Sequence, residues 1–203
     1  SVVLFDVDGT IVDSAPAVMD AFRGALSHYG LPIPDEQRLR SYVGPPLWYS
    51  FGDLGYEGEL LANLVTGYRS RYQDHYLDPE PFPGVIELLH ELHDAGVALA
   101  TATSKQAPMA LAQMEHLGLS SVFDVIAGAT PDPASSKATV IHEALTRLKA
   151  RGVDISHPVI VGDSVWDVRG AQEAGIPVIG VGWGYATEDG LDEADAVCET
   201  VDD

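Results

Sequence analysis

The chain has 203 residues, of which 46% are apolar, enough for one full domain or for a domain that carries a smaller inserted one. Its 31 acidic and 11 basic residues give a net charge of −20, which argues against nucleic acids and anionic membranes as general partners, because both require clustered lysine and arginine. No apolar run approaches the length of a membrane span, and a single cysteine, Cys198, permits no internal disulfide.

The first predicted strand is residues 2–5, a short apolar run that indicates a fully buried strand. Residues 15–80 follow it and are predicted to be helical, because apolar residues recur at helical spacing between turns rich in glycine and proline. The helices are expected at 15–29, at 35–42, directly after the turn at 44–46, and at 58–76. We therefore interpret residues 15–80 as a helical insertion, and residues 1–14 and 81–203 as the domain that carries it.

From residue 85 onward, predicted helices and strands alternate. The helices are expected at 85–95, 106–117, 137–150 and 165–174, and the strands at 97–102, 122–127, 158–161, 177–181 and 196–198. This alternation predicts an α/β fold with a parallel sheet covered by helices on both faces. Ligands bind such sheets beyond the carboxyl ends of the strands, so the segments 6–10, 101–105 and 162–167 are the candidate functional residues.

Carboxylates follow two of these strands. Asp6 and Asp8 lie one residue apart, so their side chains point the same way in an extended segment, at a cost unless a cation or proton lies between them. Asp163 ends another strand and Asp167 lies one helical turn later. Solvated loop acids and an N-cap are the simpler alternatives. Four carboxylates at one sheet edge would require a divalent cation, and oxygen ligands indicate Mg²⁺.

Two further segments suit a phosphate group. Thr103 and Ser104 lie at a strand end, where hydroxyl groups and the N–H groups leading into a helix can hold a phosphate oxygen, although both residue types are also common in strands and caps. Lys137 opens a helix, where its charge opposes the helix dipole. A solvated surface lysine is the simpler interpretation, but an anionic site would compensate for this position.

In chain order, Asp6-Val7-Asp8-Gly9-Thr10, then Thr103, then Lys137, then Gly162-Asp163 with Asp167 resemble the four motifs of the haloacid dehalogenase superfamily. The helical insertion resembles the small α-helical cap of its phosphoglycolate phosphatases. This resemblance implies a Rossmann-like core over which the cap closes. Two residues depart from the common pattern, since Ser104 stands where many relatives have Asn and Ala138 where many have Pro.

The resemblance also implies roles for these residues. Asp6 would be the nucleophile that forms an aspartyl-phosphate, and Asp8 the general acid and then the general base. Mg²⁺ would be held by Asp6, Asp8 and Asp163, with Asp167 acting through water or by orienting Lys137. The implied phosphate contacts are Gly9, Thr10, Thr103, Ser104 and Lys137, and the implied catalytic set is Asp6, Asp8, Thr103 and Lys137.

The implied function is a Mg²⁺-dependent phosphomonoester hydrolase that acts on a small phosphorylated metabolite of the phosphoglycolate type. The presence of Asp8 argues against a dehalogenase, and the absence of lysine from residues 14–82 argues against a phosphonoacetaldehyde hydrolase. A 5′-nucleotidase-like phosphatase is the first alternative, because of the double proline after Gly44. A sugar-phosphate mutase and a non-enzymatic phosphate-binding protein are the others.

Substrate selection is expected from the insertion, with Gly44, Pro45 and Arg69 facing the substrate, although the first two also fit a plain helix–turn–helix linker. The three tryptophans are expected to be packing residues, and the scattered histidines form no zinc pattern. We expect a cytoplasmic monomer or homodimer without a signal peptide, whose partner is a small molecule rather than a nucleic acid polymer or a membrane.

Overall fold

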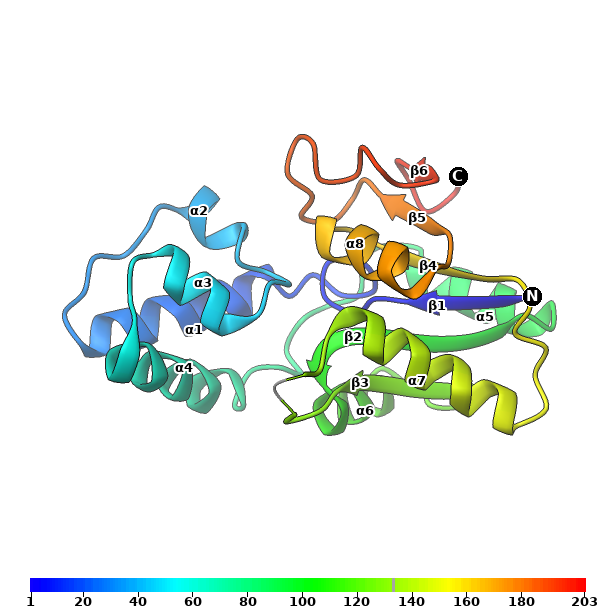
Figure 1. The fold of residues 1–203 in the computed structure, drawn as a ribbon, viewed down its shortest axis with the longest axis horizontal. Coiled ribbons are helices and arrows are strands. Elements are labelled where there is room, and N and C mark those ends of the chain that lie inside the picture. The colour runs from blue at the N-terminus through cyan, green and yellow to red at the C-terminus, as the bar shows by residue number, and fades with distance from the viewer. Residues whose placement is uncertain (133) are drawn as a thin grey trace.

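The computed structural model describes residues 1–132 and 134–203 and has the expected α/β architecture (Figure 1). Six strands form one sheet in the order β3-β2-β1-β4-β5-β6, and every neighbouring pair is parallel. The strands are β1 (Val2–Phe5), β2 (Ala98–Gln106), β3 (Val125–Ala129), β4 (Pro158–Gly162), β5 (Val178–Val181) and β6 (Ala196–Cys198). The strand order reverses at β1, so the end of β1 lies at the point where ligands bind such sheets.

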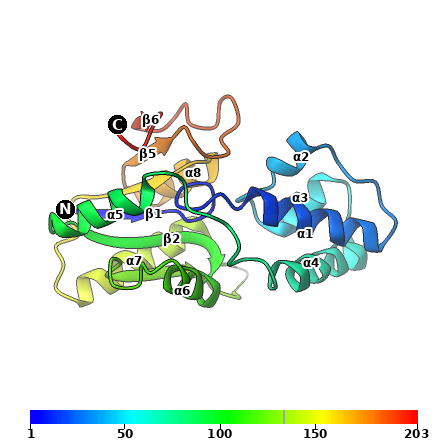
Figure 2. The same cartoon turned by 180° about the vertical axis from the view of Figure 1, so that it is seen from behind.

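Helices cover both faces of the sheet. Helices α7 (Lys137–Ala150) and α8 (Val165–Ala174) lie in front of it in Figure 1, and α5 (Val85–Asp94) and α6 (Ala107–His116) lie in front in the view from behind in Figure 2. Each face therefore has its own apolar cluster, and the sheet is buried on both sides.

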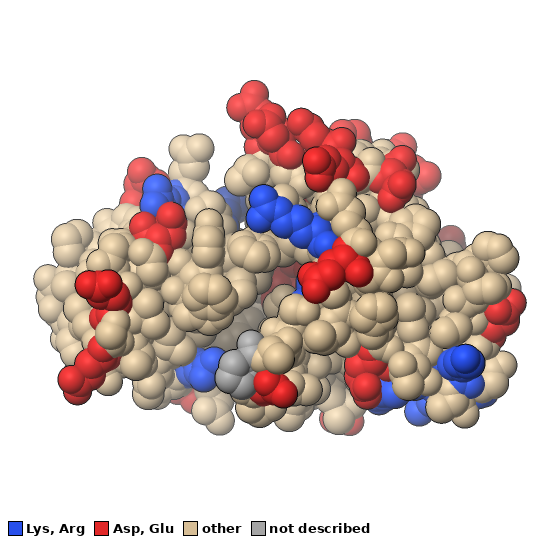
Figure 3. Space-filling view, in the orientation of Figure 1, with Lys and Arg blue, Asp and Glu red and all other residues tan. Residues whose placement is uncertain are grey.

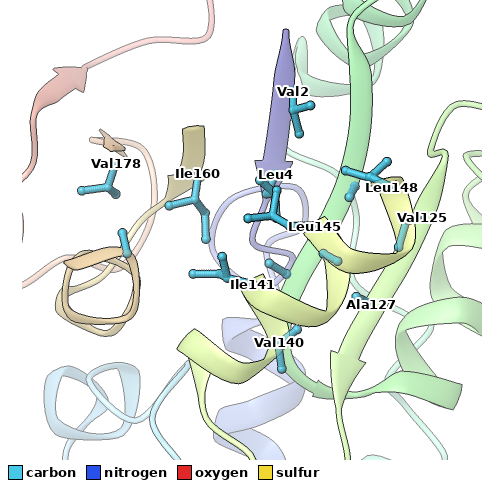
Figure 4. Close-up of a cluster of buried hydrophobic side chains, with 14 of the residues drawn as sticks. Val2, Leu4, Val125, Ala127, Val140, Ile141, Leu145, Leu148, Ile160 and Val178 are labelled. Carbon is cyan, nitrogen blue, oxygen red and sulfur yellow. The ribbon is translucent and has the colours of Figure 1, made fainter. Parts of the chain in front are cut away.

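The alternation of side chains along β1 explains why a run of apolar residues is required there. Val2 and Leu4 point into the cluster under α7, whereas Val3 and Phe5 point into the cluster on the other face. Figure 4 shows Leu4 beside Ile141 and Leu145 of α7. Since Leu4 is fully buried, its burial stabilises the fold by about 1.5–3 kcal/mol.

The inserted segment forms a separate lobe of four helices, at the left in Figure 1. They are α1 (Ala15–His28), α2 (Glu36–Arg40), α3 (Leu47–Asp53) and α4 (Gly58–Tyr72). The lobe has its own core around the ring of Phe22, whose centroid lies 4.9 Å from those of Phe51 and Tyr68. The boundaries at 14/15 and 80/81 remain a prediction.

Two connectors join the lobe to the sheet, and they pair with each other. Val12 and Pro81 form an antiparallel bridge, the Asp13 N–H donates to the Glu80 carbonyl at 2.9 Å, and the Phe82 N–H donates to the Ile11 carbonyl at 2.9 Å. The lobe is therefore attached through one narrow, paired hinge.

Some element bounds differ from those predicted. The predicted helix over 58–76 ends at Tyr72, and residues 73–77 form turns. In these turns the N–H groups of Asp74 and His75 donate to carbonyls three residues earlier, instead of four as in an α-helix. The strand predicted over 97–102 continues to Gln106 with a register irregularity after Thr103. The strand predicted over 122–127 begins at Val125, and Val122 and Phe123 instead pack into the apolar cluster beneath α5. Among the described residues, no helix combines the length and the apolar composition that crossing a bilayer requires.

Candidate active site

The loop after β1 places Asp6 and Asp8 at the carboxyl end of the central strand. The Val7 carbonyl accepts hydrogen bonds from the N–H groups of Thr10, Ile11 and Val12, which folds the loop tightly. Gly9 has a φ of +84°, a conformation that a glycine adopts without strain, so the backbone can turn sharply there. Asp6 is buried, and Asp8 is half-buried.

Three buried carboxylates converge beside this loop. Asp6, Asp163 and Asp167 each offer an oxygen, and these oxygens lie within 4.8 Å of one another. Lys137 Nζ lies 2.9 Å from Asp6 Oδ1 and 2.8 Å from Asp167 Oδ1, and it donates a hydrogen bond of 3.0 Å to the Ala102 carbonyl. One ammonium group against three carboxylates leaves the cluster with excess negative charge.

Burial and the excess negative charge raise the pKa values of two carboxyl groups in the cluster. Burial and the charge of Asp167 together raise the pKa of Asp6 from 3.8 to about 7, against the opposing effect of Lys137. Burial and the charges of Asp167 and Asp6 likewise raise the pKa of Asp163 well above its usual range. For Lys137, burial lowers the pKa, but Asp167 and Asp6 outweigh it and the net shift is upward. The buried oxygens and the surplus charge fit a hard divalent cation.

The backbone around Asp163 leaves no room for other side chains. Asp163 accepts hydrogen bonds from Thr10 Oγ1 at 3.3 Å and from the Tyr185 N–H at 2.8 Å. A Cβ at Gly9 or at Gly184 would lie only 2.3 Å from an atom of Asp163. Both glycines therefore allow two loops to close around this carboxylate.

Asp167 is held by protein groups at both of its oxygens. Its Oδ2 accepts hydrogen bonds from the N–H and the hydroxyl of Ser164, at 3.1 and 2.9 Å, which caps the start of α8. Its Oδ1 forms the ion pair with Lys137, without the alignment of a hydrogen bond. Asp167 thus fixes the position of Lys137 relative to α8.

The segment at the end of β2 lies at the same edge of the sheet. Thr103 is buried, and its Oγ1 accepts a hydrogen bond of 3.1 Å from the Lys105 N–H, whereas Ser104 is exposed. Helix α7 begins at Lys137 because the Ser136 hydroxyl caps it by accepting a hydrogen bond from the Thr139 N–H at 3.2 Å. Of the expected phosphate-binding residues, Thr10 and Lys137 thus contact the acidic cluster directly, and Thr103 follows Ala102, whose carbonyl accepts from Lys137.

Lys105 is a residue of this region whose importance the motifs did not indicate. It is only 8% exposed, and its Nζ lies 3.0 Å from Asp8 Oδ1 and 2.5 Å from Gln113 Oε1. The sequence placed Lys105 at the end of the candidate segment 101–105 and as one of three lysines, but gave it no role. Each aspartate of the first motif thus has its own buried lysine.

Tyr185 is a second such residue. Besides the hydrogen bond from its N–H to Asp163, its hydroxyl donates to Asp13 and accepts from the Ala15 N–H at 3.0 Å. The guanidinium carbon of Arg40, in α2, lies 4.9 Å from the centre of its ring. Tyr185 therefore contacts the acidic cluster, the hinge and the helical lobe at once, although only its place after the glycines of 182–184 hinted at this.

The structure does not assign a role to the lobe residues that were expected to face the substrate. Gly44 and Pro45 are half-buried, and Arg69 is exposed in the last turn of α4, so their role in substrate selection stays a prediction. The expectation that Trp48 packs is wrong, because it is 65% exposed. The surface is hollowed where the lobe meets the sheet, and charged side chains lie around this hollow (Figure 3).

The other two tryptophans make defined contacts. Trp183 is partly buried and donates a hydrogen bond from Nε1 to the Thr10 carbonyl at 3.1 Å. Trp166, at the start of α8, meets the ring of Tyr49 from α3 edge-on at 5.3 Å between centroids. This aromatic pair joins the lobe to the sheet at a contact separate from the hinge.

Comparison with known proteins agrees with the geometry. Residues 3–181 match the family model described as haloacid dehalogenase-like hydrolase. The chain is 35% identical to a phosphoglycolate phosphatase of Caulobacter vibrioides, over 92% of this chain and 81% of that protein. It is 32% identical to a 5′-nucleotidase of Pseudomonas aeruginosa, over 93% and 86%, and 38% identical to the tyrosine-protein kinase PtkA of Mycobacterium tuberculosis, over 98% and 67%.

Solved structures share the whole architecture. A haloacid dehalogenase-like hydrolase from Streptococcus pneumoniae superposes with a TM-score of 0.89 at 32% identity, covering 98% of this chain and 94% of that chain. The structure of Mycobacterium tuberculosis PtkA gives a TM-score of 0.85 at 36% identity, covering 99% and 94%. The chain therefore belongs to the haloacid dehalogenase-like hydrolase family, and it is an enzyme of that family's phosphatase type.

Proposed function

We propose that this enzyme hydrolyses phosphate monoesters of small metabolites through a covalent phosphate on Asp6. The observation that carries the proposal is the pairing of charges at the end of β1. Asp6 forms an ion pair with Lys137 in the buried cluster, whereas Asp8 forms an ion pair with a different lysine, Lys105. Two aspartates held separately in this way can take separate chemical roles.

The acidic cluster suits Mg²⁺. The ion would be held by the carboxylates of Asp6 and Asp163 and by the main-chain carbonyl of Asp8. When bound, it supplies positive charge that offsets the repulsion between the Asp6 carboxylate and an anionic phosphate. We assign Asp167 to the positioning of Lys137, because its Oδ1 forms an ion pair with that lysine while two hydrogen bonds from Ser164 hold its Oδ2.

The reaction has two steps. An oxygen of Asp6 attacks phosphorus and the bond to the leaving oxygen breaks, while Asp8 gives a proton to that oxygen. Asp8, now a carboxylate, takes a proton from water as the water oxygen attacks phosphorus and the bond to Asp6 breaks. Lys137 and the groups around Thr103 hold the phosphate oxygens, where negative charge is greatest during transfer. The products are an alcohol and inorganic phosphate.

A small phosphorylated acid of the phosphoglycolate type is the proposed substrate. Arg40 supports this assignment, because its guanidinium lies over Tyr185 beside the acidic cluster and has no carboxylate partner in the described part of the chain. A carboxylate at the far end of the substrate would pair with it. The similarity to the Caulobacter vibrioides phosphatase agrees with this choice.

Nucleoside monophosphates are the second candidate. The exposed ring of Trp48, directly after the 44–46 turn, offers a surface on which a base could stack, and the Pseudomonas aeruginosa relative is a 5′-nucleotidase.

The test is phosphate release from a panel of esters with Mg²⁺ and with EDTA. The panel contains phosphoglycolate, nucleoside 5′-monophosphates, sugar phosphates and an aryl phosphate. We expect Mg²⁺-dependent release with phosphoglycolate preferred, and trapping of a phosphate on Asp6 by acid quenching. A further arm supplies ATP and a tyrosine peptide, because of the similarity to PtkA. Transfer to tyrosine without hydrolysis, or no release from any ester, would overturn the proposal.

A further inference from the structure

We propose that Lys105 is a positioning residue that holds the Asp8 carboxylate in the orientation needed for proton transfer to the leaving group. The inference rests on the proposed function, because it assigns Asp8 the role of general acid. It concerns a residue outside the four motifs, on the segment where β2 runs further than its apolar pattern predicts.

The contacts of Asp8 point to Lys105 as its anchor. The ion pair joins Lys105 Nζ to Asp8 Oδ1 at 3.0 Å, and the exposed fractions of the two side chains are 3% and 16%. In the described part of the chain, Asp8 has no other side-chain hydrogen bond. One carboxylate oxygen is thus held, and the other is left to exchange a proton.

Lys105 itself is firmly fixed. Its N–H donates to Thr103 Oγ1, its Nζ donates to Gln113 Oε1 in α6, and the ring centre of Tyr72 lies 5.6 Å from Nζ. A buried ammonium group is costly unless such partners surround it. The lysine therefore cannot follow a rotation of Asp8, so the ion pair fixes the carboxylate.

The same chain of contacts reaches the helical lobe. Gln113 Nε2 donates a hydrogen bond of 3.1 Å to the carbonyl of Tyr76, in the turns that follow α4. Tyr72, which faces Lys105, is the last residue of α4. Asp8 is thus positioned from the sheet and from the connector of the lobe together.

The experiment compares two esters that differ in their need for a proton. The leaving group of an alkyl phosphate requires protonation, whereas that of para-nitrophenyl phosphate departs as a stable anion. For Lys105→Met we expect the single-turnover rate of Asp6 phosphorylation, the step in which the leaving group takes its proton, to fall about 100-fold with the alkyl ester and less than about 5-fold with the aryl ester. The matched control is Lys149→Met, which removes an exposed lysine from the end of α7 and is expected to change neither rate.

A double-mutant cycle then separates positioning from a structural role. Asp8→Asn should show the same dependence on the leaving group, and adding Lys105→Met to it should cause no further loss with the alkyl ester. Equal losses with both esters, a change confined to KM, or additive losses in the double mutant would each overturn the inference. If Lys105→Met does not fold, as judged by its thermal melt, Lys105→Gln is expected to give the same pattern.

Failure of the proposed function looks different. It would be seen in the wild-type protein as an absence of phosphate release, or in Asp8→Asn as an equal loss with both esters in the single-turnover rate of Asp6 phosphorylation, and either result would overturn the inference as well. If the wild type releases phosphate and Asp8→Asn depends on the leaving group, but Lys105→Met does not, the proposed function stands and this inference alone fails.

Discussion

The carboxyl edge of the sheet and the helical lobe that faces it are built from different chemistry. At the sheet edge, charged side chains are buried, and Lys137 joins Asp6 and Asp167 over distances below 3 Å. In the lobe, the buried side chains are apolar, with several rings packed around Phe22, and the arginines are exposed or half-buried. Buried charges at strand ends tolerate few changes, whereas an aromatic core can present many different surfaces. We infer that the sheet edge carries the reaction and the lobe the choice of substrate.

Besides the hinge, separate side-chain contacts join the two regions. Tyr49 of the lobe contacts Trp166, Arg40 contacts Tyr185, and the Tyr76 carbonyl accepts from Gln113. Single contacts of this kind can separate and re-form more easily than a continuous apolar interface. They fit a lobe that opens to admit substrate and closes to exclude water.

The largest effect is expected at the sheet edge. Asp6→Asn removes the proposed nucleophile, so kcat should fall by at least about 10⁴-fold. The fold should persist, and the metal-free variant should melt at a higher temperature than the wild type near neutral pH, because a buried charge with surplus negative neighbours is gone. Asp20→Asn, at an exposed carboxylate of α1, is the control. Near-normal turnover in Asp6→Asn would remove Asp6 as the nucleophile.

The same buried charges predict how stability depends on pH and metal. The pKa of Asp6 is about 7 in the folded protein, against 3.8 ordinarily, so the folded state binds more protons between these values. The contribution of Asp6 to stability is therefore fully present below about pH 4 and is lost as the pH rises through about 7. Mg²⁺ favours the ionised form, so it should raise the melting temperature more at about pH 8 than at about pH 5. An equal shift at both pH values in thermal melts would contradict this account.

The residues at the carboxyl edge of the sheet were largely predictable from sequence, and the contacts between that edge and the helical lobe were not. Helices α7 and α8 begin and end where their periodicity and caps indicated, and parallel strands necessarily bring Asp6 and Asp163 to one edge. Lys105 fell within the candidate segment 101–105, but its burial and its pairing with Asp8 were not predicted, because its polar neighbours suggest an exposed loop. Only the tertiary fold reveals that β2 continues, and that α6 supplies the partner that allows this lysine to be buried.

The choice of substrate should change at the surface of the lobe. Arg40→Gln should raise KM for phosphoglycolate about 10-fold, because it removes an ion pair with the substrate carboxylate, and should leave KM for an aryl phosphate unchanged. Arg23→Gln, on the exposed side of α1, is the control. The same substitution at Arg69 decides between the two arginines. A change in KM at Arg69 and none at Arg40 would return the assignment to the one made from sequence.

The smallest effect is expected where α3 touches α8. Tyr49→Ala removes the edge-on contact with Trp166, a loss of about 0.5–1.5 kcal/mol, so kcat/KM should fall only a few-fold, by weakening the closed arrangement. This substitution is a cleaner test of closure than a bulky residue at Gly44, whose φ of +106° would itself strain the turn. Tyr29→Ala is the matched control, because Tyr29 is 42% exposed and Tyr49 41%. If closure excludes water from the intermediate, Tyr49→Ala should hydrolyse the phosphorylated enzyme no more slowly than the wild type while losing efficiency in forming it. Slower hydrolysis in a single-turnover experiment would show that the contact serves the second step instead.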